Sequence, residues 1–306
     1  MDRLRPSSRR STMLCVVLAT VAAFVLSCSS GDAPAAAPSR SPSDTGSGSA
    51  SPSPSAVPTS SKYPNAIVVL GHSGTTGFDS DPSAQGTDAN QNSWATGDNP
   101  AVNSVYTRLL ALNPAVRGHS SNFGVDGTDI DDLGSQVDQA LALTPLPDLF
   151  MIQEVDNDMQ CDGTDPDNYP HFGQTLSDLL TTITAKAPHA TILLVSSPPG
   201  TVRNYGTVVA TLPGPKAANT GTGPCDMFSP EGDAVPAAWR YQAQIIRHYQ
   251  AQLETVCSRF PTCRYDGGAL YRMTITAEDL APDGMHLSVS GHKKQAALEW
   301  RVLGLR

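Results

Sequence analysis

The chain has 306 residues, and its 20 Lys and Arg against 29 Asp and Glu give a formal net charge of −9. Nucleic acids and anionic lipid surfaces are bound by clustered basic side chains, so this acidic balance argues against both as partners. Removal of residues 1–27, which contain four arginines and one aspartate, would make the remaining chain more acidic still.

The N-terminus has the pattern of an export signal. Four arginines precede an apolar run at residues 13–26, which is shorter than the roughly 20 residues that span a bilayer. Residues 1–27 are therefore interpreted as a signal peptide. The segment Val25-Leu26-Ser27-Cys28 resembles a bacterial lipobox and predicts lipidation of Cys28. An ordinary signal peptide with a chance cysteine stays open because Leu26 is bulky for its position, and the paired arginines leave Sec and Tat export open.

Residues 28–62 are almost wholly Ser, Pro, Ala, Gly, Thr and Asp. Such a segment cannot bury enough apolar surface to offset its conformational entropy. It is predicted to be a disordered tether between the lipidated cysteine and a single domain at residues 63–306, which is long enough for a substantial core.

Within this domain, short apolar runs alternate with segments of helical periodicity. Strands are predicted at residues 66–70, 120–123, 148–153, 190–196 and near 264–266, and helices at 99–112, 130–143, 171–187, 235–259 and 290–303. An alternation repeated about five times indicates an α/β fold with a parallel sheet and helices on both faces. Residues 79–99 and 198–233 are predicted loops, and the second is long enough to be a lid or specificity loop.

The domain contains four cysteines, an even number that favours disulfides in an exported chain. No Cys-x-x-Cys spacing suggests zinc. Three pairings are possible. We favour Cys257 with Cys263, which close a short loop, and this leaves Cys161 with Cys225.

Polar groups follow the predicted strands where each strand ends. Ser73 follows the first strand, residues 124–129 follow the second, residues 156–158 follow the third, and Asp283 and His286 follow the last. Since the carboxyl ends of parallel strands meet at one edge of a sheet, where ligands bind, these groups are expected to lie together.

The groups gathered at this edge suit acyl transfer. A serine hydroxyl needs a base within hydrogen-bond reach, and an imidazole is oriented by a carboxylate on its other nitrogen. Asp283-x-x-His286 supplies both within one turn. The backbone N–H of Gly127 and the side-chain amide of Asn157 are candidate donors to a developing oxyanion.

Four segments resemble the signature blocks of the GDSL/SGNH esterases, in their usual order. They are Gly71-His72-Ser73, Asn122-Phe123-Gly124-Val125-Asp126-Gly127, Asn157-Asp158 and Asp283-Gly284-Met285-His286. The resemblance implies a three-layer α/β/α, flavodoxin-like fold (the SGNH hydrolase fold). It also implies Ser73 as nucleophile, His286 as base, Asp283 as its partner, an oxyanion hole from Ser73, Gly127 and Asn157, and neither metal nor cofactor.

Two positions depart from the family pattern, because His72 replaces the aspartate of Gly-Asp-Ser and Val155 opens the Gly-x-Asn-Asp block. Adjacent extended residues point to opposite sides, so His72 is expected to pack or hydrogen-bond beneath the site and not to deprotonate Ser73. The spacing Asp158-x-Gln160-x-Asp162 starts like a calcium loop, but the closing position is Tyr169 where such a loop has Glu. No metal site is predicted there.

These observations predict an exported serine hydrolase that cleaves carboxylic esters, of lipids or of acylated carbohydrates, through an acyl-serine intermediate. It is expected to be a monomer, anchored to the outer face of the cytoplasmic membrane by the lipid on Cys28, or secreted. Two alternatives stay open: an O-acyltransferase acting on envelope carbohydrate, and an inactive glycan-binding lipoprotein.

Overall fold

The computed structural model describes residues 62–305. The predicted signal peptide, Cys28 and all but the last residue of the predicted tether lie outside the described residues. Within residues 62–305, no helix is both long enough and apolar enough to cross a membrane.

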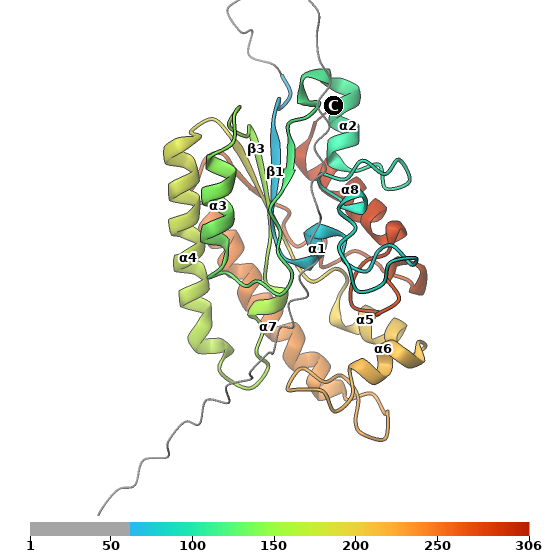
Figure 1. Ribbon diagram of the computed structural model, residues 1–306. Coiled ribbons are helices and arrows are strands. Elements are labelled where there is room, and N and C mark those ends of the chain that lie inside the picture. Colours follow the sequence, from blue (N-terminus) through green and yellow to red (C-terminus); the bar gives the residue numbers. More distant parts are fainter. Residues whose placement is uncertain (1–61, 306) are drawn as a thin grey trace, which may run out of the picture. The chain divides into compact units, whose positions relative to one another are not determined.

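Five strands form one parallel sheet at the centre of this domain (Figure 1). They are β1 (Ile67–Gly71), β2 (Ser120–Asn122), β3 (Leu149–Gln153), β4 (Thr191–Val195) and β5 (Cys263–Tyr265). Their spatial order, β2-β1-β3-β4-β5, is that of flavodoxin-like folds. The winding direction changes between β1 and β3, so the loops that follow these two strands flank the point where such sheets bind ligands.

Helices cover both faces of the sheet, which confirms the predicted three-layer α/β/α fold (Figure 1). One layer contains α3 (Leu133–Leu141), α4 (Asp165–Lys186) and α7 (Pro236–Cys257), and the other contains α2 (Val105–Leu112), α5 (Val202–Val209) and α8 (Val289–Leu303). The remaining elements are α1 (Ser73–Thr76), α6 (Pro213–Ala218) and 3₁₀ turns at Asn90–Asn92, Pro114–Val116, Asp156–Asp158 and Ala277–Asp279.

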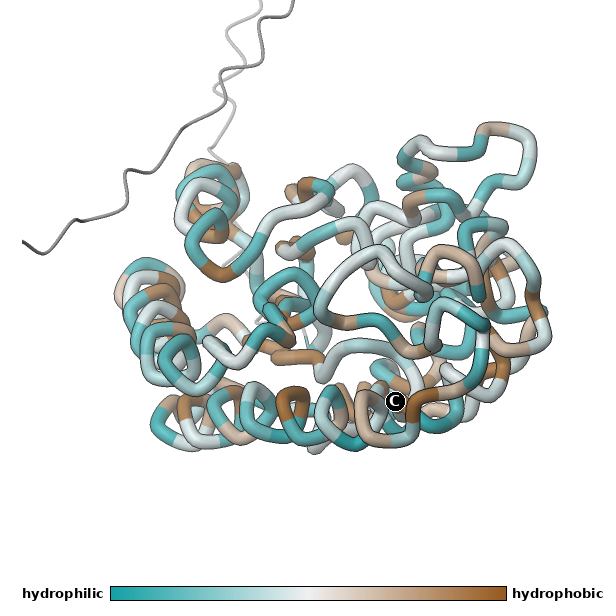
Figure 2. Tube along the Cα trace, turned by 90° about the horizontal axis from the view of Figure 1, so that it is seen from below, coloured by the Kyte–Doolittle hydropathy of each residue, from teal (hydrophilic) through white to brown (hydrophobic). Residues whose placement is uncertain are grey.

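The core lies on both sides of the sheet because neighbouring side chains of a strand point to opposite faces. Val69 of β1 and Met151 of β3 enter the layer of α2 and α8, whereas Leu70 and Ile152 enter the layer of α3 and α4. In a view from below Figure 1, hydrophobic and hydrophilic residues alternate along the long helices (Figure 2). Each helix therefore turns an apolar stripe toward the sheet.

Two predicted helix starts were wrong. Helix α2 begins at Val105 and not near residue 99, because Ser104 caps it by accepting the N–H of Thr107. Helix α4 begins at Asp165, six residues before the predicted start and despite an internal Pro170. The buried Asp165 carboxylate accepts the N–H groups of Gln160 and Cys161, and this tertiary contact anchors the first turn.

The segment predicted as a long loop, residues 198–233, contains the helices α5 and α6. Thr201 caps α5 by accepting the N–H of Asn204, and Val202 and Val209 are buried in the core. The Gly, Pro and Thr content of the segment concealed both short helices. The stability of α5 depends on burial more than on helix propensity, whereas α6 has no buried residue.

The structure contains the two favoured disulfides. Cys161 is bonded to Cys225, and Cys257 is bonded to Cys263. The first connects the segment after β3 with the segment between α6 and α7, and both of these segments border the site described below.

Candidate active site

Ser73 is the first residue of α1, directly after β1 ends. The chain turns at Gly71, whose φ is +142° and where an added Cβ would lie 2.3 Å from the carbonyl oxygen of Gln153. Only glycine fits this conformation and this close approach. Because the first N–H groups of a helix have no carbonyl partner within it, the backbone N–H of Ser73 can serve an external acceptor.

His72 caps the helix that Ser73 begins. It is buried, and its Nδ1 accepts the N–H of Gly74 at 3.1 Å, a contact at which an aspartate is also common. Burial lowers the pKa of His72 below 6.5, although nearby Asp156 acts in the opposite direction. A neutral imidazole that accepts at Nδ1 carries its proton on Nε2, which lies 3.7 Å from the Asp156 carboxylate. His72 therefore hydrogen-bonds beneath the site, as expected.

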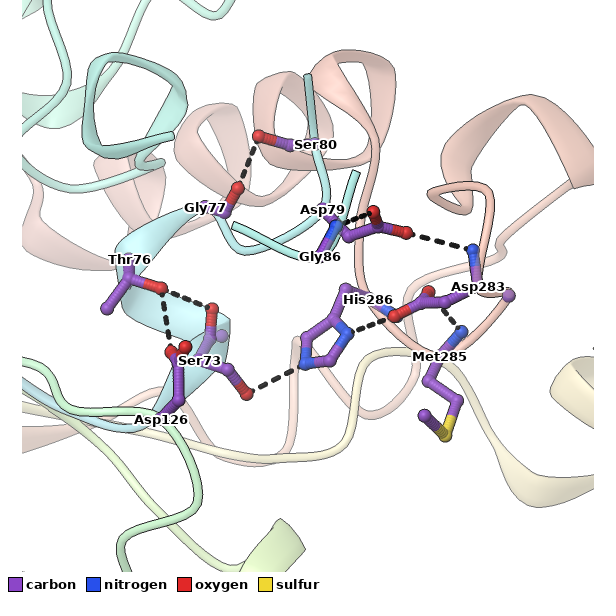
Figure 3. Close-up of polar contacts among 12 residues, drawn as sticks. Ser73, Thr76, Gly77, Asp79, Ser80, Gly86, Asp126, Asp283, Met285 and His286 are labelled. Atoms are coloured by element: carbon purple, nitrogen blue, oxygen red, sulfur yellow. Dashed lines mark hydrogen bonds and ion pairs between the residues drawn. The ribbon is translucent and has the colours of Figure 1, made fainter. Parts of the chain in front are cut away.

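Ser73, His286 and Asp283 form one continuous hydrogen-bonded chain (Figure 3). His286 Nε2 lies 2.7 Å from Ser73 Oγ, and His286 Nδ1 lies 2.5 Å from Asp283 Oδ2. The ring of Phe78 packs against the imidazole with the two centroids 4.8 Å apart. The serine and the imidazole come from opposite ends of the domain, 213 residues apart in sequence.

The Asp283 carboxylate is held from both sides. Its Oδ1 accepts the backbone N–H groups of Met285 at 2.8 Å and His286 at 3.0 Å, while Oδ2 faces the imidazole. Burial alone would raise the pKa of Asp283, but the hydrogen bonds from the side chain and backbone of His286 outweigh it and lower the pKa. Asp283 is therefore ionised in the folded protein at neutral pH.

Asp79 supports this turn and was missed by the sequence analysis. Its Oδ2 accepts the N–H of Asp283 at 3.0 Å, and its Oδ1 accepts the N–H of Gly86 at 2.8 Å (Figure 3). Asp79 is buried and has a positive φ of 56°. It lies in a polar segment where nothing in the sequence distinguishes it from its neighbours.

The candidate oxyanion donors come from two loops that are bonded to each other. Asn157 Nδ2 donates to the carbonyl of Thr128 at 2.8 Å, and Asp158 Oδ1 accepts the N–H of Ile130 at 3.1 Å. The first bond uses one amide hydrogen of Asn157 and leaves the second available. Gly127 precedes Thr128, with a φ of +74° and open space where a Cβ would lie.

Val155, the second departure from the family pattern, adopts a backbone conformation that disfavours valine. Its φ is +117°, a region that β-branched residues rarely enter, and its side chain is fully buried. The position therefore suits the glycine of the family block. The valine adds apolar contact below Asn157 at the cost of backbone strain.

A cavity of about 450 Å³ opens beside Ser73 and is bordered by Gly127, Asn157 and His286. The polar side chain of Gln153 borders the cavity and is oriented by Trp94, whose indole N–H donates to Gln153 Oε1 at 2.9 Å. Gln295 Nε2 donates to the same oxygen at 2.8 Å. Trp94 itself is fully buried and does not border the cavity. Among residues 62–305, no group of three or more His, Cys, Asp or Glu could hold a metal ion.

Comparison with known proteins gives a family match. Residues 69–294 match the model of the GDSL-like lipase/acylhydrolase family. No curated protein matches the chain.

Solved structures with similarity include a protein described as a GDSL-like lipase from Parabacteroides merdae, with 19% identity and a TM-score of 0.49 over 79% of this chain and 96% of that one. An acetyl xylan esterase from Geobacillus stearothermophilus has 20% identity and a TM-score of 0.43 over 78% and 96%. A carbohydrate esterase family 2 enzyme from Corynascus thermopiles has 16% identity and a TM-score of 0.48 over 81% and 69%.

Since these TM-scores are below 0.5, the assignment depends on the family model, which covers well over half of the chain. The four sequence blocks found above lie within or at the borders of the matched segment. The chain belongs to the GDSL-like lipase/acylhydrolase family and is a carboxylic ester hydrolase.

Proposed function

We propose that this hydrolase works through an acyl-serine intermediate, with Ser73 as nucleophile, His286 as general base and Asp283 as the residue that orients the imidazole. The observation that carries the proposal is the unbroken chain from Asp283 through His286 to Ser73 Oγ, which opens on the cavity. Both nitrogen-to-oxygen separations, 2.5 Å and 2.7 Å, are within hydrogen-bond distance.

The reaction would proceed in two steps, acylation and deacylation of Ser73. His286 Nε2 takes the proton of Ser73 as its Oγ attacks the ester carbonyl, and then gives that proton to the departing alcohol. Water, deprotonated by the same imidazole, attacks the acyl-serine, and the acid is released as His286 returns the proton to Ser73. Ionised Asp283 stabilises the imidazolium that forms in both steps.

The negative oxygen of each tetrahedral intermediate needs donors placed before the reaction. We assign this role to the N–H of Ser73, the N–H of Gly127 and the free amide hydrogen of Asn157. The bond from Asn157 to Thr128 supports the assignment, because it aligns the side-chain donor with the loop that carries Gly127.

Export is part of the proposal. Residues 1–27 would be a signal peptide, Cys28 the lipidated N-terminus, residues 28–62 the tether, and residues 63–306 the hydrolase domain. The two disulfides support an oxidising compartment. Replacing Cys28 by Ser tests the anchor: we expect loss of lipid incorporation and release of the protein from membranes, and unchanged membrane retention would contradict it.

The nucleophile is tested by labelling with a fluorophosphonate, which reacts with activated serines. We expect the native protein to be labelled at Ser73 and Ser73→Ala to be unlabelled, while Ser135→Ala, an exposed serine on α3, keeps full labelling. Absence of label on the native, folded protein would overturn the catalytic assignment and favour an inactive binding module. Product analysis with an added sugar acceptor separates hydrolysis from acyl transfer.

A further inference from the structure

The cavity beside Ser73 has two chemically different parts. All its titratable acids and imidazoles lie around the nucleophile: His72, Asp126, Asp156 and His286. The rest of the lining carries no charge, and the side chains of its apolar wall include Met159, Val202, Met227, Ile246, Leu280 and Leu287.

This wall belongs to the hydrophobic core. Val202, Met227, Ile246, Leu280 and Leu287 are all buried members of the cluster that fills the layer of α2 and α8. The cavity therefore extends from the sheet edge into the protein between α5, α7 and the turn that precedes α8, elements that Figure 1 shows below and beside α1.

Polar side chains that border the cavity direct their hydrogen bonds elsewhere. The Tyr205 hydroxyl donates to the Gly284 carbonyl, Asn219 Nδ2 donates to the Pro215 carbonyl, and Gln242 Nε2 donates to the Cys225 carbonyl. Gln153 lies at the catalytic end, since a Cβ on Gly74 would be 2.7 Å from its Nε2. Gln295 also borders the cavity, and its buried Oε1 has no hydrogen-bond partner among the described residues, so the cavity keeps one polar position besides the catalytic end. The wall formed by Val202, Met227 and Ile246 is apolar and has little capacity to hold water.

We infer that the enzyme selects esters of a medium-length apolar acyl chain, and that the cavity wall formed by Val202, Met227 and Ile246 sets the chain length. This inference rests on the proposed function. The orientation follows from the chemistry, because His286 must reach the leaving alcohol, which therefore departs on the side of the exposed Met285. We assign the acyl group to the apolar wall that includes Met159, which follows the oxyanion donor Asn157 by two residues.

The cavity volume sets the scale of the chain. A water molecule occupies about 30 Å³ in the liquid, so 450 Å³ corresponds to about fifteen groups of that size. After space for the ester group and for the part of the alcohol that lies at the catalytic end of the same cavity, on the order of eight to ten carbon atoms fill the remainder. The single methyl group of an acetate would leave most of this apolar surface without contact.

The test measures kcat/KM of the full chain with p-nitrophenyl esters from acetate to palmitate. Each methylene that enters the cavity is worth about 0.8 kcal/mol, so we expect kcat/KM to rise by about fourfold per added carbon up to octanoate or decanoate and then to stop rising. A flat profile, or a maximum at acetate, would overturn the inference.

A filling variant locates the chain. Val202→Phe narrows the cavity from α5 and is expected to lower kcat/KM for octanoate at least tenfold more than kcat/KM for acetate. Its circular dichroism spectrum, compared with that of the native protein, shows whether the variant folds. Val208→Phe, on the same helix but not at the cavity, is the matched control and should leave the chain-length profile unchanged.

Three further outcomes are informative. If octyl acetate gains rate over ethyl acetate while the acyl series is flat, the cavity binds the alcohol and the inference is wrong. If Ser73 takes no fluorophosphonate label and no ester is cleaved, the proposed function fails. Labelling of Ser73 with preferential acetate hydrolysis refutes only the chain-length inference.

Discussion

Replacing Asp283 by Asn is expected to abolish most activity, because it moves the proton of the neutral His286 imidazole from Nδ1 to Nε2. The Oδ1 position accepts two backbone N–H groups, from Met285 and His286, and an asparagine has only one acceptor oxygen. The amide oxygen must stay at the Oδ1 position. In the reverse orientation, the amide NH₂ group would face the backbone N–H groups of Met285 and His286, and donors would oppose donors. With the oxygen at the Oδ1 position, the amide nitrogen faces His286 Nδ1, which can only accept.

An imidazole that accepts at Nδ1 carries its proton on Nε2 and can no longer take the proton of Ser73. Loss of the correct tautomer in a serine triad lowers kcat by about 10⁴, which equals about 5.5 kcal/mol in the activation free energy. Substrate binding does not involve Asp283, so KM should change little.

The assay is steady-state hydrolysis of p-nitrophenyl octanoate, together with the rate of fluorophosphonate labelling. Asp131→Asn is the matched control, because Asp131 forms the other short Asp–His contact, 2.7 Å from His171 on the exposed surface. The control should keep wild-type kcat. If Asp283→Asn kept more than a tenth of wild-type kcat, the argument from the two backbone donors would be refuted.

Three further predictions concern stability and the loops around the site. Val155 has a φ of +117°, so the Val155→Gly variant should have a free energy of unfolding in urea about 1 kcal/mol higher than that of Val155→Ala, the reverse of the usual order. If Val155→Ala were the more stable variant, the backbone at this position would not be strained. Replacing Cys161 and Cys225 together by Ala should cost about 4 kcal/mol, from a sequence separation of 64, and reduction should lower turnover before the core unfolds; unchanged turnover in reductant would contradict this. Burial raises the pKa of Asp158 from 3.8 to about 7. Between pH 4 and pH 7 the native state therefore holds a proton that the unfolded chain has released, and the contribution of this carboxyl to stability falls as the pH rises. Asp158→Asn should therefore gain stability relative to wild type across that range, and a constant difference would exclude the shift.

Much of the fold was predictable because its signals are local. Buried strands such as β1 and β3 are runs of consecutive apolar residues, and the long helices α4 and α7 carry apolar positions at helical spacing. Where local signals conflict with tertiary contacts, prediction failed. Pro170 concealed the first turns of α4, which depend on Asp165. The short helix α5 depends on the burial of Val202 and Val209, which no short segment reveals.

The candidate site shows the same division. By itself, the sequence determined which residues can take part, since Ser73, Asp283 and His286 stand in recognisable motifs that follow strands. Only the tertiary structure decided that Asp79 holds the N–H of Asp283 across 204 residues, that His72 caps α1, and that an apolar cavity continues into the core. A motif records the neighbours of a residue along the chain. A cavity is the space left between side chains from distant segments, and its shape is set only when those segments pack together.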